Sequence, residues 1–157
     1  MLQGKGIITD IQKKVLSVFS QFPDAPKFYL TGGTALSEFY LGHRLSYDLD
    51  FFTPEIDLIS PFSEAMQTEL GKREFAAVAV RRFQTFAELK LSKGEEKTTI
   101  HLAYDSPFRF FPPVDTTYGV KAKDYTDIII DKILTFFGRA EPRDAVDLFF
   151  ILKTEDS

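Results

Sequence analysis

The apolar residues of the chain follow helical spacing in five segments. Between positions 8 and 22 they recur every three to four residues, while Lys13 and Lys14 fall on the opposite side, which predicts an amphipathic helix. Similar spacing continues from Leu36 to Tyr40, where Gly42 is placed to end the helix. Three further helices are predicted at residues 60–70, 124–137 and 142–153.

Five other segments have the alternation or the β-branched and aromatic composition of strands. They cover residues 27–31, 48–53, 75–83, 85–92 and 98–104. A hairpin turn between the last two is predicted at Lys93-Gly94-Glu95-Glu96. The order of helices and strands predicts an α+β, or mixed α/β, domain with one central sheet. Since no repeat or linker interrupts the chain, residues 1–157 are expected to form a single domain.

Composition narrows the classes of function to consider. The 157 residues include 17 Phe and 6 Tyr, which predicts an aromatic core, and no Cys, which excludes disulfides, thiolate metal sites and Cys nucleophiles. A net charge of −4 argues against a broad surface that coats nucleic acid, although a local basic groove fits. No apolar run reaches about 18 residues and the N-terminus lacks a signal-peptide pattern, so we expect no membrane span and a cytoplasmic protein.

A glycine pair stands where a predicted strand passes into a helix. Backbone N–H groups of Gly32, Gly33 and Thr34 would face outward there, and together with the helix dipole they favour an anion such as a triphosphate. Glycine suits this role because a Cβ would block the close approach of a phosphate. The Thr34 hydroxyl is a candidate for one more contact. The same residues also fit an ordinary tight turn in which Thr34 caps the helix.

Two carboxylates alternate with apolar residues in the strand that follows. Because side chains two residues apart point to the same face, Asp48 and Asp50 should lie roughly 6.5–7 Å apart on one face, with Leu49 and Phe51 directed toward the core. The two negative charges repel unless a cation lies between them, and Mg²⁺ or Mn²⁺ would also leave positions for phosphate oxygens. The alternative is an edge strand with a solvated acidic face. The glycine pair upstream favours the metal.

Two basic residues lie between these motifs. Arg44 suits a phosphate because its guanidinium is always charged and can bind bidentately, but it suits equally well a pair with a nearby carboxylate such as Asp48. His43 follows Gly42, which ends a helix, and a histidine at such a place more often caps or packs than acts as a general base.

The two C-terminal helices carry a third group of charges. Lys132 and Arg139 are two turns apart and share a helix face, while Asp144 lies where the positive end of the last helix favours a carboxylate. Asp144 and Asp147 are three residues apart and also share a face. By themselves, these residues and Arg143 indicate a solvated helical face with local ion pairs.

Two blocks of sequence resemble the signature of the AbiEii/AbiGii-type nucleotidyltransferases, a bacterial and archaeal branch of the DNA polymerase β-like nucleotidyltransferase superfamily. The first block is Gly32-Gly33-Thr34-Ala35-Leu36 with Gly42-His43-Arg44-x-Ser46-x-Asp48-Leu49-Asp50-Phe51-Phe52. The second block is Asp131-Lys132-x6-Arg139-x3-Arg143-Asp144-x2-Asp147-Leu148. Together the blocks frame residues 28–152, and their combination is more specific than either block alone.

The resemblance implies a minimal nucleotidyltransferase fold, with a central mixed sheet flanked by helices. It implies Mg²⁺-dependent transfer of a nucleoside monophosphate from an NTP to an acceptor hydroxyl. Characterised relatives include toxins of toxin–antitoxin systems, some of which modify tRNA, so a tRNA or protein acceptor and an antitoxin partner are further expectations. The implied roles are phosphate binding by Gly32, Gly33 and Thr34, metal binding by Asp48 and Asp50, triphosphate contact by Lys132, and a place near the site for Asp144 or Asp147.

One departure from the family pattern concerns the third carboxylate of the superfamily, which lies on a later strand. The corresponding strand reads Thr99-Ile100-His101-Leu102-Ala103, so His101 stands in that position. Asp105 shares the face of His101 but is four residues away, about 13 Å along the strand. Three outcomes are open: His101 acts as base or metal ligand, an Asp of the C-terminal helices substitutes, or catalysis is weak or lost.

Two other functions therefore stand beside the active enzyme. One is a catalytically degenerate module with the same fold that binds nucleotide or another protein, and the other is a phosphohydrolase that uses the same Asp pair. A small groove for a nucleic-acid end has five candidate basic residues: Lys121, Lys123, Lys132, Arg139 and Arg143.

Overall fold

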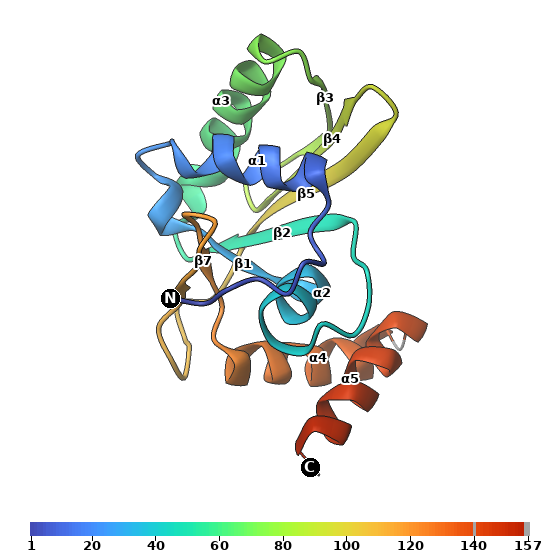
Figure 1. Ribbon diagram of the computed structural model, residues 1–157. Coiled ribbons are helices and arrows are strands. Elements are labelled where there is room, and N and C mark those ends of the chain that lie inside the picture. The colour runs from blue at the N-terminus through green and yellow to red at the C-terminus, as the bar shows by residue number, and fades with distance from the viewer. Residues whose placement is uncertain (140, 156–157) are drawn as a thin grey trace.

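One mixed β-sheet organises the protein, whose computed structural model describes residues 1–139 and 141–155 (Figure 1). Its strands are β1 (Tyr29–Thr31), β2 (Asp48–Thr53), β3 (Ala76–Arg82), β4 (Phe86–Lys93), β5 (Glu96–Tyr104), β6 (Val114–Asp115) and β7 (Lys121–Ala122). Their order is β3-β4-β5-β2-β1-β7-β6. The β2–β5 and β1–β7 pairs are parallel and the other pairs are antiparallel, which confirms the mixed central sheet.

Two helices pack against one face of the sheet, and the others lie at its lower end in Figure 1. They are α1 (Asp10–Ser20), α2 (Gly32–Ala35) with a π-helical continuation (Leu36–Leu41), α3 (Ile59–Lys72), α4 (Tyr125–Arg139) and α5 (Pro142–Glu155). Helix α1 begins with a capping box formed by Thr9 and Gln12. Gly42 ends the π-helical segment at φ +61°, a left-handed conformation that suits glycine. None of the described helices is long and apolar enough to cross a membrane.

The core between the sheet and helices α1 and α3 is aromatic, as its composition predicts. Phe19 of α1 stacks on Phe51 of β2 with ring centroids 4.0 Å apart, and it also contacts Phe28 and Phe62. In β2, Leu49 and Phe51 are fully buried, whereas the alternating residues Asp48 and Asp50 lie on the opposite face. The predicted division of this strand into a core face and a polar face is therefore confirmed.

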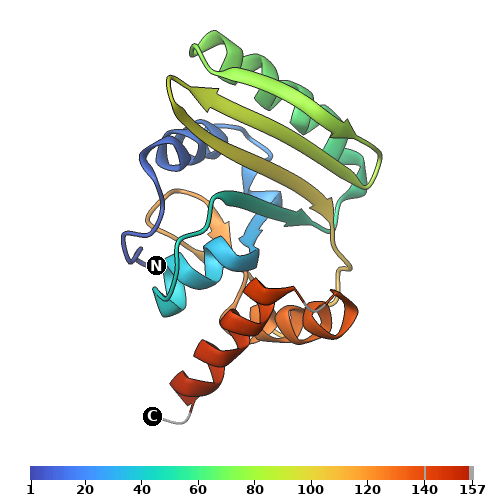
Figure 2. The same ribbon diagram turned by 90° about the vertical axis from the view of Figure 1, so that its right-hand side faces the viewer.

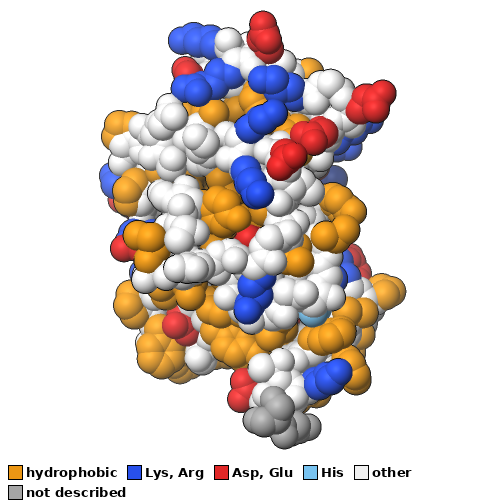
Figure 3. Space-filling model, viewed as in Figure 1, with side chains coloured by type: hydrophobic (Ala, Val, Ile, Leu, Met, Phe, Trp, Pro, Cys, Tyr) orange, Lys and Arg blue, Asp and Glu red, His pale blue; other side chains and the backbone are white. Residues whose placement is uncertain are grey.

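The opposite face of strands β3, β4 and β5 has no helix over it in the part of the chain that the structure describes (Figure 2). Outward residues of these strands, such as Val78 and Lys90, are exposed. Apolar side chains are also exposed around α4 and α5, on the lower part of the surface in Figure 3. Helices thus cover the sheet unequally, and the polar face of β2 stays accessible.

Three details of the fold differ from the sequence-based expectation. The strands β6 and β7, which extend the sheet beyond β1, were not predicted because two residues are too few to show a period. The second helical segment begins at Gly32 rather than at residue 36, since its first turn consists of small residues without an apolar stripe. Strand β1 begins at Tyr29 because a 3₁₀ turn, Ala25–Lys27, precedes it.

We expect Phe19→Ala to lower the free energy of unfolding by about 3–5 kcal/mol, because it opens a cavity among the three rings that Phe19 contacts. Urea denaturation at neutral pH measures this change. Phe137→Ala is the matched control, since its ring is 82% exposed, and it should change stability by less than about 0.5 kcal/mol. Equal effects of the two substitutions would contradict the assigned core.

Candidate active site

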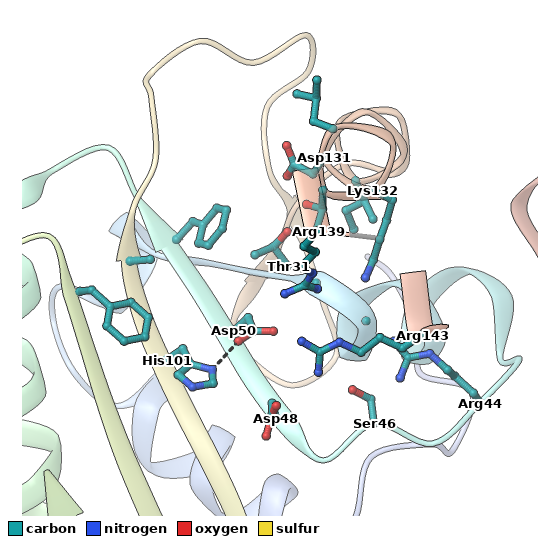
Figure 4. Close-up of a pocket in the computed structure, with 18 residues that line it drawn as sticks. Thr31, Arg44, Ser46, Asp48, Asp50, His101, Asp131, Lys132, Arg139 and Arg143 are labelled. Carbon is teal, nitrogen blue, oxygen red and sulfur yellow. Dashed lines mark hydrogen bonds and ion pairs between the residues drawn. The ribbon is translucent and has the colours of Figure 1, made fainter. Parts of the chain in front are cut away.

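A cleft of about 460 Å³ lies between the polar face of the sheet and helices α4 and α5 (Figure 4). Its sheet side carries Asp48, Asp50 and His101, and its helix side carries Arg139 and Arg143. Gly32 and Gly33, at the point where β1 passes directly into α2, also line it and are called the glycine turn below. The volume is within the range of small-molecule sites, and the cleft joins both sequence blocks that were separate along the chain.

Asp48 and Asp50 face the cleft side by side on β2, as the alternation of this strand predicts. Burial raises the pKa of Asp48, and repulsion from Asp50 raises it further, while His101 and Arg143 act in the opposite direction. The negative charge at this position is thus only partly compensated by the surrounding protein. A cation bound between the two carboxylates would relieve that repulsion.

His101 lies beside Asp50 because β5 and β2 pair in parallel with these two residues in register. Its Nδ1 is 2.7 Å from Asp50 Oδ1, and its Nε2 is 3.6 Å from Glu88 Oε2. The hydrogen bond with Asp50 raises the pKa of His101 above its ordinary value and outweighs burial, which lowers it. With a carboxylate at each nitrogen, the ring is placed to donate to Asp50 rather than to accept a proton.

Glu88, which does not line the cleft but lies against His101, was not singled out from the sequence. It lies on β4 directly opposite His101, so Asp50, His101 and Glu88 form one row across three strands, and Arg81 of β3 ends the row 3.6 Å from Glu88. A signal for it did exist. The predicted turn pairs Lys93 with Glu96, and counting outward from that pair places Glu88 opposite His101.

The two glycines of the turn give room to side chains of the site. Gly32 has φ +73°, and a Cβ on it would lie 2.6 Å from Asp50 Oδ2. A Cβ on Gly33 would collide with the guanidinium of Arg44. The glycines therefore permit the close approach of a carboxylate and a guanidinium, a reason for their presence that does not depend on phosphate.

Thr34 does not line the cleft, in contrast to the expected contact between its hydroxyl and a phosphate. Its side chain is fully buried, its hydroxyl donates to the backbone carbonyl of Asp48, and it lies 2.7 Å from the hydroxyl of Ser46. The residue that precedes α2 is Thr31, so Thr34 is not the helix cap either. The hydroxyl of Thr34 instead ties the beginning of β2 to the glycine turn.

A buried carboxylate, Asp147 of α5, holds the charged residues behind the cleft. It accepts hydrogen bonds from Arg44 Nε (2.7 Å) and Nη2 (2.9 Å) and from His43 Nε2 (2.6 Å), and it pairs with Lys132 Nζ at 2.8 Å. Burial alone would raise the pKa of Asp147, but the hydrogen bonds from Arg44, His43 and Lys132 outweigh it and hold the pKa well below its ordinary value.

The contacts of Asp147 show which of the predicted partners Arg44 has and whether His43 packs or is free to act as a base. Arg44 pairs with a carboxylate, but the partner is Asp147 rather than Asp48. His43 has a buried side chain whose ring centroid is 5.2 Å from that of Phe150, so it is a packing residue. Arg44 still reaches the edge of the cleft, although its guanidinium is already occupied by two hydrogen bonds to Asp147.

Asp144 is buried in the same way. Arg139 donates to it from Nε (2.8 Å) and Nη2 (3.1 Å), and Lys132 Nζ lies 3.5 Å away; the hydrogen bonds from Arg139 lower its pKa despite burial. The prediction that these charges form a solvated helical face is therefore wrong for α5, because Asp144 and Asp147 are both fully buried. Both carboxylates are occupied by cations, so neither takes the place of the third carboxylate beside Asp50.

The five basic residues suggested for one groove do not form one. Lys121 pairs with Asp115 at the sheet edge, at 2.9 Å. Lys123 is buried and pairs with Asp105 (3.2 Å) and Asp131 (2.6 Å). Neither of these lysines lines the cleft, and each is already paired with a carboxylate; for Lys123, one of these carboxylates, Asp131, does line it.

Arg139, Arg143 and Lys132 do line the cleft. Figure 4 shows the two arginines extending toward the side that carries the Asp pair. Arg143 is exposed, and its Nε lies 2.9 Å from Glu141, so its ion pair is at the surface rather than buried. Of the three, Arg143 has the charge that a bound anion can most easily recruit.

The mixed sheet, the glycine turn and the carboxylate pair facing a basic helix pair are the features expected of the nucleotidyltransferase class. Residues 14–157 match the family described as "Nucleotidyl transferase AbiEii toxin, Type IV TA system". The chain therefore belongs to this family, which confirms the resemblance of the two sequence blocks. None of the curated protein sequences matches the chain.

Solved structures share the fold. JHP933 from Helicobacter pylori is 21% identical, with a TM-score of 0.64 over 91% of this chain. MenT4, a nucleotidyltransferase toxin from Mycobacterium tuberculosis H37Rv, is 18% identical, with a TM-score of 0.57 over 80% of this chain. The chain spans 63% of the first structure and 51% of the second. At these identities the likeness establishes the fold.

We expect Asp147→Asn to lower the free energy of unfolding by about 3–5 kcal/mol at neutral pH, because it leaves buried cations without their partner. The pKa of Asp147 is depressed in the folded state, so its contribution is complete above the unfolded pKa of about 3.9 and is lost as the pH falls toward the folded value. The difference between wild type and variant in urea denaturation should therefore narrow below about pH 4.

Asp57→Asn serves as the control for this substitution, since Asp57 is exposed and has no ion pair in the described structure. It should match the wild type at every pH. A difference between Asp147→Asn and wild type that stays constant down to acidic pH would contradict the depressed pKa.

Proposed function

We propose that the protein transfers a nucleoside monophosphate from an NTP to an acceptor hydroxyl with the help of Mg²⁺ or Mn²⁺. The observation that carries this proposal is the pair Asp48 and Asp50, which faces a cleft lined by the glycine turn and by arginines opposite. Membership in the AbiEii toxin family supports it, and supports an antitoxin as a partner of the protein.

The donor set in the cleft fits a divalent metal. Carboxylate oxygens are the preferred ligands of Mg²⁺, which commonly takes one or two carboxylates and completes its shell with water and substrate phosphates. Within residues 1–139 and 141–155 no group of three His or acidic residues is arranged to hold a metal alone. Asp48 and Asp50 would therefore supply two ligands, and oxygens of the substrate and water would supply the rest. Such a site fits the ligand preference of Mg²⁺ and needs no third protein ligand. The metal would supply positive charge to the attacking and leaving oxygens.

The protein's own residues bind and orient the triphosphate in this proposal. No side chain caps the start of α2, so the backbone N–H groups of Gly32 and Gly33 are suited to phosphate oxygens. Arg143 would turn from Glu141 toward the phosphates. Lys132, which the family pattern assigns to the triphosphate, is held by Asp144 and Asp147, and we propose that it fixes the helix pair instead.

In the reaction, the acceptor oxygen attacks the α-phosphorus and forms the new phosphodiester bond. The bond to the bridging oxygen breaks, pyrophosphate leaves, and the hydroxyl proton passes to solvent. His101 positions Asp50 through the hydrogen bond at Nδ1, while Glu88 holds the other edge of the ring. The third carboxylate of the superfamily is thus replaced by a residue that orients one of the other two.

We expect Asp48→Asn to reduce Mg²⁺-dependent NTP binding and transfer by at least about 10²-fold, since several kcal/mol of charge stabilisation are lost. Calorimetric titration of the four NTPs, with and without Mg²⁺, measures binding, and pyrophosphate release measures transfer. The midpoint temperature of thermal unfolding of Asp48→Asn should not fall below that of the wild type, because the substitution removes the repulsion between residue 48 and Asp50. Asp57→Asn is again the control and should bind like the wild type.

Three results would contradict the proposal. Full activity of Asp48→Asn would exclude the metal role of this residue. NTP binding that is absent, or independent of metal, would indicate a degenerate binding module with the same fold. NTP consumption in the absence of any acceptor would indicate a phosphohydrolase.

The role of His101 is tested by two substitutions. Asn can place an amide N–H near the position of Nδ1, so we expect His101→Asn to retain transfer within about tenfold, whereas His101→Ala loses about 10²-fold, as is typical when a ligand's partner is removed. The rate of pyrophosphate release at saturating NTP measures both. An equal, larger loss in both variants would show that the ring itself takes part in proton transfer.

A further inference from the structure

The loop that leads into β2 is held by a network of hydrogen bonds to its backbone. It comprises residues 43–47, which lie outside any helix or strand, and it ends at Asp48. Each backbone carbonyl from residue 44 to residue 48 accepts a hydrogen bond from a side chain. Loops are usually the more mobile parts of a protein, so this loop is held more firmly than its lack of regular structure suggests.

Four of the five donors are buried side chains from four different elements of the fold. They are Gln12 of α1, Thr34 of α2, Ser37 of the π-helical segment and Thr98 of β5, which bind the carbonyls of residues 46, 48, 44 and 47 in that order. The distance is 3.1 Å from Gln12 Nε2 and 2.7 Å from Thr98 Oγ1. Because a buried hydroxyl or amide is costly to leave without a partner, these donors tie the loop to the rest of the fold.

Gln12 is shared between the start of α1 and the loop. Its Oε1 accepts a hydrogen bond from the backbone N–H of Thr9 at 3.0 Å and completes the capping box, while its Nε2 donates to the carbonyl of Ser46. Helix α1 packs on the core face of the sheet, whereas Ser46 lines the cleft. One amide group therefore connects a helix cap behind the sheet to the loop that enters the cleft.

The two carboxylates of the cleft are held in different ways. Asp50 is bound through its side chain to His101, and its backbone lies between two paired strands. Asp48 is the first residue of β2, and none of the residues that the structure describes hydrogen-bonds to its carboxylate or forms an ion pair with it. The position of the Asp48 carboxylate therefore depends on its backbone, and so on the side chains that bind the loop.

This dependence matters for a divalent metal. Mg²⁺ requires nearly ideal octahedral geometry with ligands at about 2.0–2.1 Å, and the residues of such a site have to be held within about 0.5 Å of the productive geometry. A carboxylate on a loosely held loop would have to be ordered each time a metal binds, and that ordering weakens binding.

We propose that four side chains hold the backbone of Asp48 in place for a divalent metal. These positioning residues are Gln12, Thr34, Ser37 and Thr98. They act through the carbonyls of the loop, and none of them lines the cleft. Thr34 has the largest effect, because it is bound to the carbonyl of Asp48 itself and also lies 2.7 Å from the hydroxyl of Ser46. This role rests on the metal binding by Asp48 proposed above.

The first test measures the factor by which Mg²⁺ strengthens NTP binding, by calorimetric titration of the four NTPs with and without the metal. Thr34→Val should reduce this factor about tenfold, as is typical when an outer-shell partner of a metal site is lost, and should leave binding without Mg²⁺ unchanged. Thr34→Ser keeps the hydroxyl and should stay within about threefold of the wild type. Loss of folded protein would lower the amount of bound NTP under both conditions, so the factor separates positioning from stability.

Thr116→Val is the matched control for Thr34→Val. The hydroxyl of Thr116 is also buried and donates to a backbone carbonyl, that of Val120, at 2.6 Å. Thr116 does not line the cleft, so this variant should show the same effect of Mg²⁺ on NTP binding as the wild type.

Hydrogen–deuterium exchange tests the loop directly, without metal or NTP. The amides of residues 44–49 should exchange about fivefold faster in Thr34→Val, the factor expected from the loss of one hydrogen bond, while those of α3 stay unchanged. Gln12→Met should have the same effect, because it removes the bond to Ser46. Thr9→Ala removes the hydroxyl of the helix cap without touching the loop, and should not change its exchange.

Three outcomes would overturn the inference. These are an effect of Mg²⁺ in Thr34→Val that equals that in the wild type, an equal loss in Thr34→Val and Thr34→Ser, and an equal loss in Thr116→Val. Failure here is distinguishable from failure of the proposed function. If Mg²⁺ strengthens NTP binding in the wild type but not in Asp48→Asn, a normal Thr34→Val refutes only the positioning role. If Mg²⁺ has no effect on the wild type, the proposed function fails, and faster loop exchange in Thr34→Val then shows a purely structural network.

Discussion

The buried carboxylate of Asp147 is the contact on which the arrangement of the site depends. Asp147 lies on α5 and pairs with Lys132 of α4. It also pairs with His43 and Arg44, which lie in the loop between the π-helical segment and β2. Without this carboxylate, three basic groups would be buried near one another, and the helix pair would have no fixed position against the sheet. The cleft exists because α4 and α5 are held over the polar face of β2.

The cations of the protein fall into two groups with different roles. Lys132, Arg44 and Arg139 have fully buried carboxylate partners and hold elements of the fold together, as does Lys123, which is itself buried. Arg143, whose partner Glu141 is at the surface, remains available to a ligand in the cleft. In an acidic chain this division matters more than the number of basic residues, because a cation already bound to a buried carboxylate contributes little field to a substrate.

The position of the missing third carboxylate illustrates how the sheet reorganises the chemistry of the site. His101 occupies that position, and the adjacent strand supplies Glu88 on its far side. The ring therefore has negative charge at both nitrogens and acts as a bridge between Asp50 and Glu88. A residue that the sequence suggests as a base is placed by its neighbours as a donor.

Periodicity and motif determined a large part of this protein from the sequence alone. The helices, the main strands and the shared face of Asp48 and Asp50 follow from local spacing, because a helix or a strand directs its side chains by a fixed repeat. The family follows from the resemblance of two sequence blocks to its signature. Tertiary structure decided which charges meet. The partner of Arg44 is 103 residues away, Thr34 is buried by the approach of β2, and His101 meets Asp50 because β5 pairs with β2. Such contacts depend on strand register and helix docking, and no repeat along the chain encodes them.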